Sequence, residues 1–258
     1  MIHFRTVLAM PDPKAPRAYR ELLTLVVAGL GIVGYSYLTN GAPLEDLPGR
    51  IPLLAGLDGD LPSYVWRFAL CFLLLGVLPL GTALATGESL GGLGLRAPRR
   101  IGPRWVWLPV AVACLASAGI SAYDREIAAF YPYARTLLDY VRAGRVGVFG
   151  VHAALYVLLY YLPWEIVFRG LLIFPILRVS RAQDPPALLF LSSLQALPSA
   201  LLHFGHPVLE SLGAVPFGVV MGWLAYRTGS ILPGLAIHAG IGVLLDLLLA
   251  LRYVGALP

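Results

Sequence analysis

Residues 162–170 read Leu-Pro-Trp-Glu-Ile-Val-Phe-Arg-Gly, and they lie inside an apolar stretch, 146–177, that is long enough to cross a membrane. Glu165 and Arg169 are four residues apart, so a helix places both side chains on one face, close enough to pair. A charged side chain at bilayer depth costs about 2.5–3.5 kcal/mol on insertion scales and usually faces the protein interior. The pair therefore either joins two helices or belongs to a functional site.

The composition around this segment is that of a membrane protein. Of the 258 residues, 58% are hydrophobic and 13% are charged, whereas about a quarter of a soluble domain is charged. We expect an all-α, polytopic membrane bundle of about seven to eight transmembrane helices. The net charge of +5 rests on arginine, since Lys14 is the only lysine, and such charge mainly sets membrane topology. No basic face interleaved with aromatic residues indicates nucleic-acid binding.

Seven apolar stretches are the predicted spans: 22–38, 64–86, 105–123, 146–177, 186–204, 209–226 and 231–251. We expect residues 1–20 to form a cytoplasmic N-terminal arm and residues 21–258 a single transmembrane domain, with a motif-bearing core at 146–251. Residues 124–145 mix aromatic and charged side chains and indicate an interfacial element. An N-terminus on the cytoplasmic side of an inner membrane puts most basic loops, Arg227 included, inside, as the positive-inside rule requires.

Few acids and histidines lie deep in these stretches, and chemistry would have to use them. They are Glu165, Asp246, His152, His203 and His238, with His206 at the end of a span. Each histidine alone has a structural explanation: a hydrogen-bonded ring at an interface, or a ring beside closely packed helices. A glutamate and two histidines on three separate spans, Glu165, His203 and His238, favour a shared site.

The remaining two polar residues are weaker candidates. His152 precedes Glu165 by thirteen residues, which places it on roughly the opposite helix face, so we expect a structural role. Asp246 follows His238 by eight residues and lies about 80° round the helix from it, so it could orient a neighbour.

The order and spacing of these residues resemble the CAAX-protease and bacteriocin-processing enzymes, the CPBP or Abi family of intramembrane endopeptidases. The family pattern is Glu-Glu-x-x-x-Arg, then Phe-x-x-x-His, then His-x-x-x-Asn. The matching segments are Trp164-Glu165-x-x-x-Arg169, Ser199-x-x-x-His203 and His238-x-x-x-Gly242. The resemblance covers about 160–249, and it departs from the pattern where Trp164, Ser199 and Gly242 replace Glu, Phe and Asn.

The resemblance implies an endopeptidase that hydrolyses a peptide bond with activated water. In the family the first Glu is the base, and Trp164 replaces it here. Among the residues present, Glu165 could be the base, His203 would hold the water and His238 would stabilise the oxyanion. Arg169, Trp164, Gly242, Asp246 and His206 would support them. The substrate would be a membrane-anchored protein or peptide: a prenylated C-terminus, a peptide precursor or a C-terminal sorting segment.

Other functions stay open at this stage. No cofactor is expected, although zinc held by Glu165, His203 and His238 would suit a catalytic site of three protein ligands plus water. The missing first Glu and the missing Asn also fit a catalytically lapsed relative that acts as a membrane scaffold. A transporter or lipid-handling protein would show symmetric halves, and the sequence contains no internal repeat.

Overall fold

The computed structural model describes residues 16–40, 50–54, 56–98, 104–180 and 185–258. This part of the chain is helical and contains no strand, which confirms the predicted all-α class. The elements are α1 (Pro16–Asn40), α3 (Leu61–Leu70), η3 (Cys71–Val77), α4 (Leu78–Ala85), η4 (Gly91–Leu93), α5 (Arg104–Ser121), α6 (Arg125–Phe130), α7 (Arg135–Arg142), α8 (Gly147–Leu155), η5 (Tyr156–Tyr161), α9 (Leu162–Glu165), η6 (Ile166–Leu171), α10 (Phe174–Ser180), α11 (Pro185–Leu201), α12 (Val208–Thr228) and α13 (Leu232–Tyr253).

Five described stretches are long and apolar enough to cross a membrane, and a shorter apolar helix covers Leu108–Ser121. The five are Tyr19–Thr39, Leu61–Ala85, Gly147–Arg178, Val208–Thr228 and Leu232–Tyr253. The polytopic helical bundle is thus confirmed, and α5 and α11, with 18 and 17 residues, correspond to the two remaining predicted spans. The predicted arm lies mostly outside the described residues, and its last five residues, 16–20, belong to α1.

The residues expected at an interface, 124–145, form two short helices, α6 and α7, instead of a span. α6 begins at an N-cap: the Asp124 carboxylate accepts a hydrogen bond from the Ile127 backbone N–H at 2.9 Å. Such a cap satisfies a donor that the first helical turn leaves unpaired. Tyr131 follows directly after α6, and it is buried.

The stretch that carries Glu165 runs without a break through α8, η5, α9 and η6, and we call it the motif helix. Pro163 lies inside it and has no N–H to donate. Around the proline the helix widens to π-type turns: the Leu162 N–H bonds to the Val157 carbonyl, and the Leu172 N–H to the Val167 carbonyl. Turns of this kind are frequent at functional sites because they re-aim side chains.

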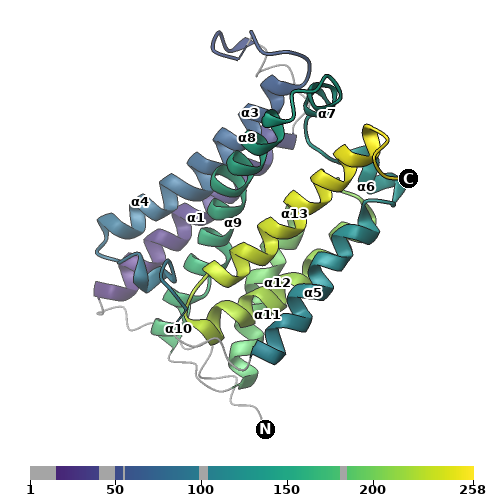
Figure 1. The fold of residues 1–258 in the computed structure, drawn as a ribbon. Coiled ribbons are helices and arrows are strands. Elements are labelled where there is room, and N and C mark those ends of the chain that lie inside the picture. Colours follow the sequence, from purple (N-terminus) through teal and green to yellow (C-terminus); the bar gives the residue numbers. More distant parts are fainter. Residues whose placement is uncertain (1–15, 41–49, 55, 99–103, 181–184) are drawn as a thin grey trace.

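The motif helix lies at the centre of the bundle. In its apolar window 67% of the residues are buried, against 22–39% in the other four spans. Helices α1, α3, η3 and α4 pack on one side of it, and α11, α12, α13 and α5 lie on the other (Figure 1). The core beside it is aromatic, with Tyr156, Tyr160, Tyr161, Trp164 and Phe168 all buried.

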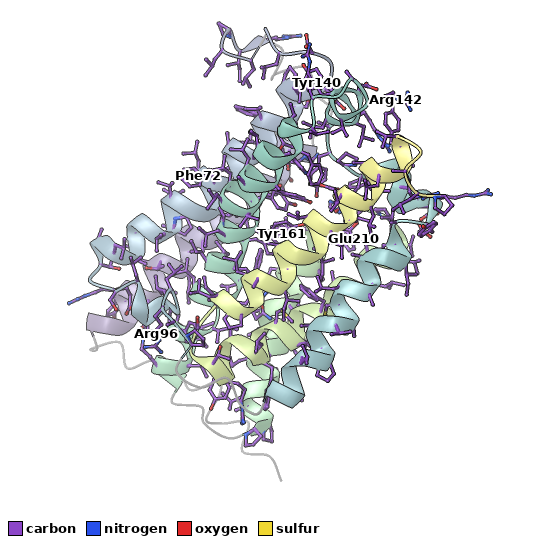
Figure 2. The ribbon with its side chains drawn as sticks, in the orientation of Figure 1. Phe72, Arg96, Tyr140, Arg142, Tyr161 and Glu210 are labelled. Atoms are coloured by element: carbon purple, nitrogen blue, oxygen red, sulfur yellow. The ribbon has the colours of Figure 1, made fainter. Side chains whose placement is uncertain are left out.

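Polar side chains lie at both ends of the bundle and also between its helices. Figure 2 shows Arg96 near one end of the molecule and Tyr140 and Arg142 near the other, with Tyr161 and Glu210 between the helices. An interior glutamate at the start of α12 was not expected from the sequence. Its neighbours define the second half of the site.

Candidate functional site

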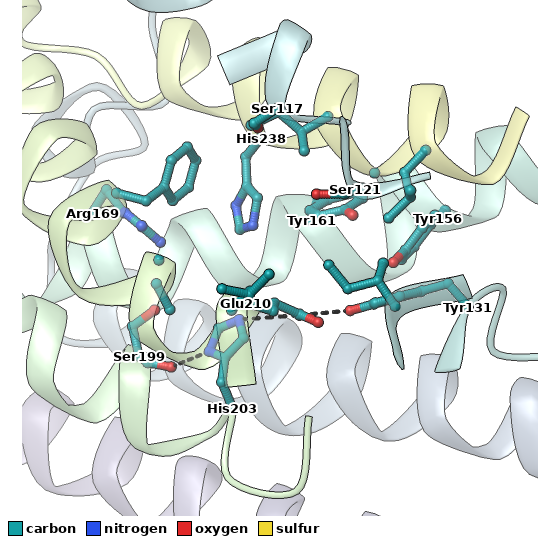
Figure 3. A pocket seen from close by; sticks show the side chains of 18 residues that line it. Ser117, Ser121, Tyr131, Tyr156, Tyr161, Arg169, Ser199, His203, Glu210 and His238 are labelled. Atoms are coloured by element: carbon teal, nitrogen blue, oxygen red, sulfur yellow. Dashed lines mark hydrogen bonds and ion pairs between the residues drawn. The ribbon is translucent and has the colours of Figure 1, made fainter. Parts of the chain in front are cut away.

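A cavity of about 270 Å³ lies between the motif helix, α5, α11, α12 and α13. Two of its walls carry ionisable side chains (Figure 3). His238 on α13 and Arg169 on the motif helix line one wall. His203, just after α11, and Glu210 on α12 line the other. Tyr131, Tyr156 and Tyr161 contribute hydroxyl groups to the same cavity.

Glu165 is joined to Arg169 and to His238. Its Oε1 lies 3.2 Å from Arg169 Nη1 and 2.8 Å from His238 Nδ1. The carboxylate and the guanidinium are 0% and 1% exposed, so the predicted i, i+4 pair forms in the interior. Glu165 lies behind His238 and does not itself line the cavity.

The helix that carries His238 approaches this carboxylate closely. A Cβ at Gly234 would lie 3.3 Å from Glu165 Oε2, and that oxygen has no hydrogen-bond partner among the described residues. The small residue at 234 lets α13 come near enough for His238 to reach Glu165.

His203 belongs to the opposite wall and does not touch Glu165. Its Nδ1 lies 2.8 Å from the Ser199 carbonyl oxygen, and since a carbonyl only accepts, Nδ1 carries the proton. The Nε2 lone pair is therefore left for the cavity, 3.8 Å from Glu210 Oε1. Of the three residues predicted to meet, Glu165 and His238 form a pair, and His203 lies across the cavity from His238.

The three residues that depart from the family pattern, Trp164, Ser199 and Gly242, lie beside this site. Trp164 Nε1–H donates a hydrogen bond to the Ser199 hydroxyl at 3.2 Å. The Trp164 ring meets the His203 ring edge to face, with centroids 5.6 Å apart. At the position of the family's Asn, a Cβ on Gly242 would overlap the Tyr161 hydroxyl. A phenol from the motif helix thus occupies the space beside residue 242.

Asp246, predicted to support the site, lies in a different group. Its Oδ2 is 2.8 Å from His152 Nε2, and His152 Nδ1 is 2.8 Å from the Tyr64 hydroxyl. Asp246 and His152 are each 2% exposed. This chain of polar contacts ties α13, α8 and α3 together, which agrees with the structural role expected for His152.

Glu210 is the residue that the sequence reasoning missed. Its Oε1 lies 2.9 Å from His206 Nδ1 and accepts a hydrogen bond from the Tyr131 hydroxyl at 2.7 Å. His206, expected only to support the site, thus pairs with an acid of its own. The available signal was the spacing His203-x-x-His206-x-x-x-Glu210, but Glu210 is the second residue of its predicted span and was not counted among the deep acids.

Glu165, His203 and His238, the ligands of the alternative zinc site, are not the residues whose ligand atoms lie closest together. Within the described residues, the group whose ligand atoms all lie within 4.8 Å of one another is His203, His206 and Glu210. The guanidinium of Arg169 beside Glu165 also opposes a cation at the expected position.

Comparison with known proteins points to the same part of the chain. Residues 147–244 match the family model described as type II CAAX prenyl endopeptidase Rce1-like. The match supports the assignment of this segment to the CPBP family of CAAX proteases. The matched segment contains the motif helix, Ser199 and His203 at the end of α11 and just after it, and His238 and Gly242 on α13. No curated protein and no solved structure matches the chain.

Proposed function

We propose that the chain is an intramembrane endopeptidase that hydrolyses a peptide bond of a membrane-associated protein or peptide in this cavity. One observation carries the proposal: the buried Glu165 is shared between Arg169 and His238, and His238 lines the same cavity as His203. A carboxylate behind a histidine, with a second histidine across a cavity, is a pattern suited to water activation.

In the proposed mechanism Glu165 acts through His238. The ionised carboxylate accepts the His238 Nδ1–H, which leaves the Nε2 lone pair to take a proton from a cavity water. The hydroxide attacks the peptide carbonyl carbon, and Glu165 stabilises the imidazolium that forms, as the carboxylate of a serine-protease triad does. The imidazolium then gives its proton to the leaving amine as the C–N bond breaks. Glu165 is thus a positioning residue instead of the base expected from the family resemblance. His203 Nε2 holds the water from the opposite wall.

The developing oxyanion needs hydrogen-bond donors. In the family pattern an Asn follows the last His by four residues, and the chain has Gly242 there. The Tyr161 hydroxyl stands beside residue 242 and lines the cavity, so we assign it the donor role. Preorganised donors of this kind usually provide the largest single contribution to lowering the barrier of acyl transfer.

The predicted membrane topology favours some of the three substrate classes over others. The turn 202–207 and the residues after α6 lie at one end of the bundle, where the Phe130 and His206 rings are 4.6 Å apart. With a cytoplasmic N-terminus, both fall on the outer side of the membrane. A membrane-anchored C-terminal sorting segment or an exported peptide precursor is then a better substrate than a prenylated C-terminus in the cytoplasm.

Cleavage by purified protein in lipid nanodiscs tests the proposal. The substrates are three quenched peptides: one with a C-terminal apolar segment, one peptide precursor and one prenylated peptide. We expect cleavage of the first or second, and a loss of about 10²–10⁴-fold in kcat with unchanged KM for Glu165→Gln. The matched control is Glu21→Gln, because Glu21 is also buried and also lies 3.2 Å from an arginine, Arg178.

Two results would count against the proposal. If none of the three peptides is cleaved, the catalytically lapsed relative that acts as a membrane scaffold is favoured. That alternative has its own support, because Trp164 and Tyr161 fill the places of the missing Glu and Asn with bulky, packed side chains. Full activity in Glu165→Gln would remove Glu165 from the mechanism.

A further inference from the structure

The wall of the cavity opposite His238 carries a cluster of two histidines and a glutamate. His203 and His206 lie in the turn between α11 and α12, and Glu210 is the third residue of α12. Figure 3 shows His203 and Glu210 side by side in the cavity. Their ligand atoms and the His206 Nδ1 all lie within 4.8 Å of one another.

Two members of this cluster, His203 and Glu210, are held by neighbours in a way that leaves a ligand atom free. The Ser199 carbonyl accepts the His203 Nδ1–H at 2.8 Å, so Nε2 keeps its lone pair. Metal-binding histidines are typically held like this, through the ring nitrogen that does not bind the metal. The Tyr131 hydroxyl donates to Glu210 Oε1 at 2.7 Å and orients the carboxylate.

The second carboxylate oxygen is the unexplained atom. Glu210 Oε2 is buried, and it has no hydrogen-bond partner among the described residues. A buried carboxylate oxygen without a partner is rare in folded proteins and calls for one. In contrast to Glu165, Glu210 pairs with no arginine in the described part of the chain; its partners there are the Tyr131 hydroxyl and the two imidazoles.

We propose that His203, His206 and Glu210 bind one divalent transition-metal ion, with zinc the preferred ion. Two imidazoles and a carboxylate are zinc ligands, and three protein ligands with an open fourth position are typical of a catalytic zinc site. When the metal binds, the 2.9 Å hydrogen bond between His206 Nδ1 and Glu210 must break, and a bond from the His206 ring to the metal replaces it. The side-chain movement is small, because zinc–ligand bonds of about 2.0–2.2 Å bring ligand atoms to a little over 3 Å apart.

The fourth position would face the cavity, since His203 and Glu210 both line it. This proposal concerns metal binding and does not depend on the peptidase proposal. In a metal-bound protein the His203 Nε2 lone pair would bind the metal instead of a cavity water. A peptidase that binds no metal and a zinc protein that cleaves nothing would be separate and recognisable outcomes.

Metal content of the purified full-length chain in nanodiscs tests the site. The protein is stripped with a chelator, titrated with Zn²⁺ and, in parallel, with Co²⁺, and the bound metal is measured by mass spectrometry. We expect about one Zn²⁺ per chain, a rise in unfolding temperature with Zn²⁺, and the visible absorption of four-coordinate Co²⁺.

Matched variants identify the ligands. His206→Gln and Glu210→Gln should lose the bound zinc, and Tyr131→Phe, which removes only the orienting hydroxyl, should weaken zinc binding about 10–100-fold. Glu165→Gln and His238→Gln should keep it, because His238 lies on the opposite wall and Glu165 lies behind it. Size-exclusion profiles and helical circular dichroism establish that each variant is folded. Absence of zinc from the wild-type chain, or full zinc content in folded Glu210→Gln, would overturn the proposal.

Discussion

The Trp164 indole N–H donates a hydrogen bond to the Ser199 hydroxyl, and each of the two residues stands where the CPBP pattern has a different one. The first Glu of the pattern and the Phe of its second motif are thus replaced by two side chains that bind each other. The pair joins the motif helix to α11 directly beside His203. Two departures that seem unrelated in the sequence are one local rearrangement in the structure.

The Trp164–Ser199 pair should therefore be energetically coupled. Ser199→Ala leaves the buried indole N–H without an acceptor, at a cost of about 1–3 kcal/mol, whereas replacing both partners is less costly than the sum. We expect a coupling free energy of about 0.5–1.5 kcal/mol from Ser199→Ala, Trp164→Phe and the double variant. Reversible unfolding in detergent gives the three values, and strict additivity would mean that the hydrogen bond contributes nothing.

Arg169→Ala should destabilise the fold as well as abolish cleavage. The substitution leaves the Glu165 carboxylate, which is 0% exposed, without its cation, and removal of one member of a buried pair costs about 3–5 kcal/mol. Arg142→Ala is the control, because Arg142 is exposed and contacts the carbonyl oxygen and ring of Tyr253 instead of a buried carboxylate. The unfolding temperature should fall much further for Arg169→Ala; equal losses would contradict a buried, desolvated pair.

Gly242→Ala should disrupt the site through Tyr161. The new methyl group would overlap the Tyr161 hydroxyl, and overpacking of this kind costs about 1–3 kcal/mol and displaces the ring. Gly213→Ala is the control within the same cavity, since a Cβ there meets nothing within 4 Å. An alanine in the interior of α12 should leave stability unchanged or raise it by up to about 1 kcal/mol. Equal behaviour of the two variants would show that Tyr161 moves aside freely.

His152→Phe separates stability from chemistry. It removes the imidazole that bridges Tyr64 and Asp246 and leaves a buried carboxylate unpaired, which costs about 1–3 kcal/mol or more for a charged group. We expect a lower unfolding temperature with unchanged KM and unchanged kcat per folded molecule, because His152 does not line the cavity. A change in kcat without loss of stability would place the His152–Asp246 pair in the catalytic machinery.

The sequence alone was enough to establish the helical membrane class, the approximate limits of the helices, the Glu165–Arg169 pair and the family pattern. These features depend on composition, apolar length and i, i+4 spacing, which are local properties of the chain. Sequence reasoning also brought His203 and His238 to one site, through the order of the motifs.

Only the tertiary structure decided which side chains share a wall of the cavity. Glu165 and Glu210 lie on different helices, and the rotation of each helix about its axis determines which imidazole each acid reaches. That rotation depends on packing between distant segments: Gly234 against Glu165, Trp164 against Ser199, and Tyr161 in the space beside Gly242. No spacing along the chain records these contacts, which is why Glu210 and its two histidines became visible only in three dimensions.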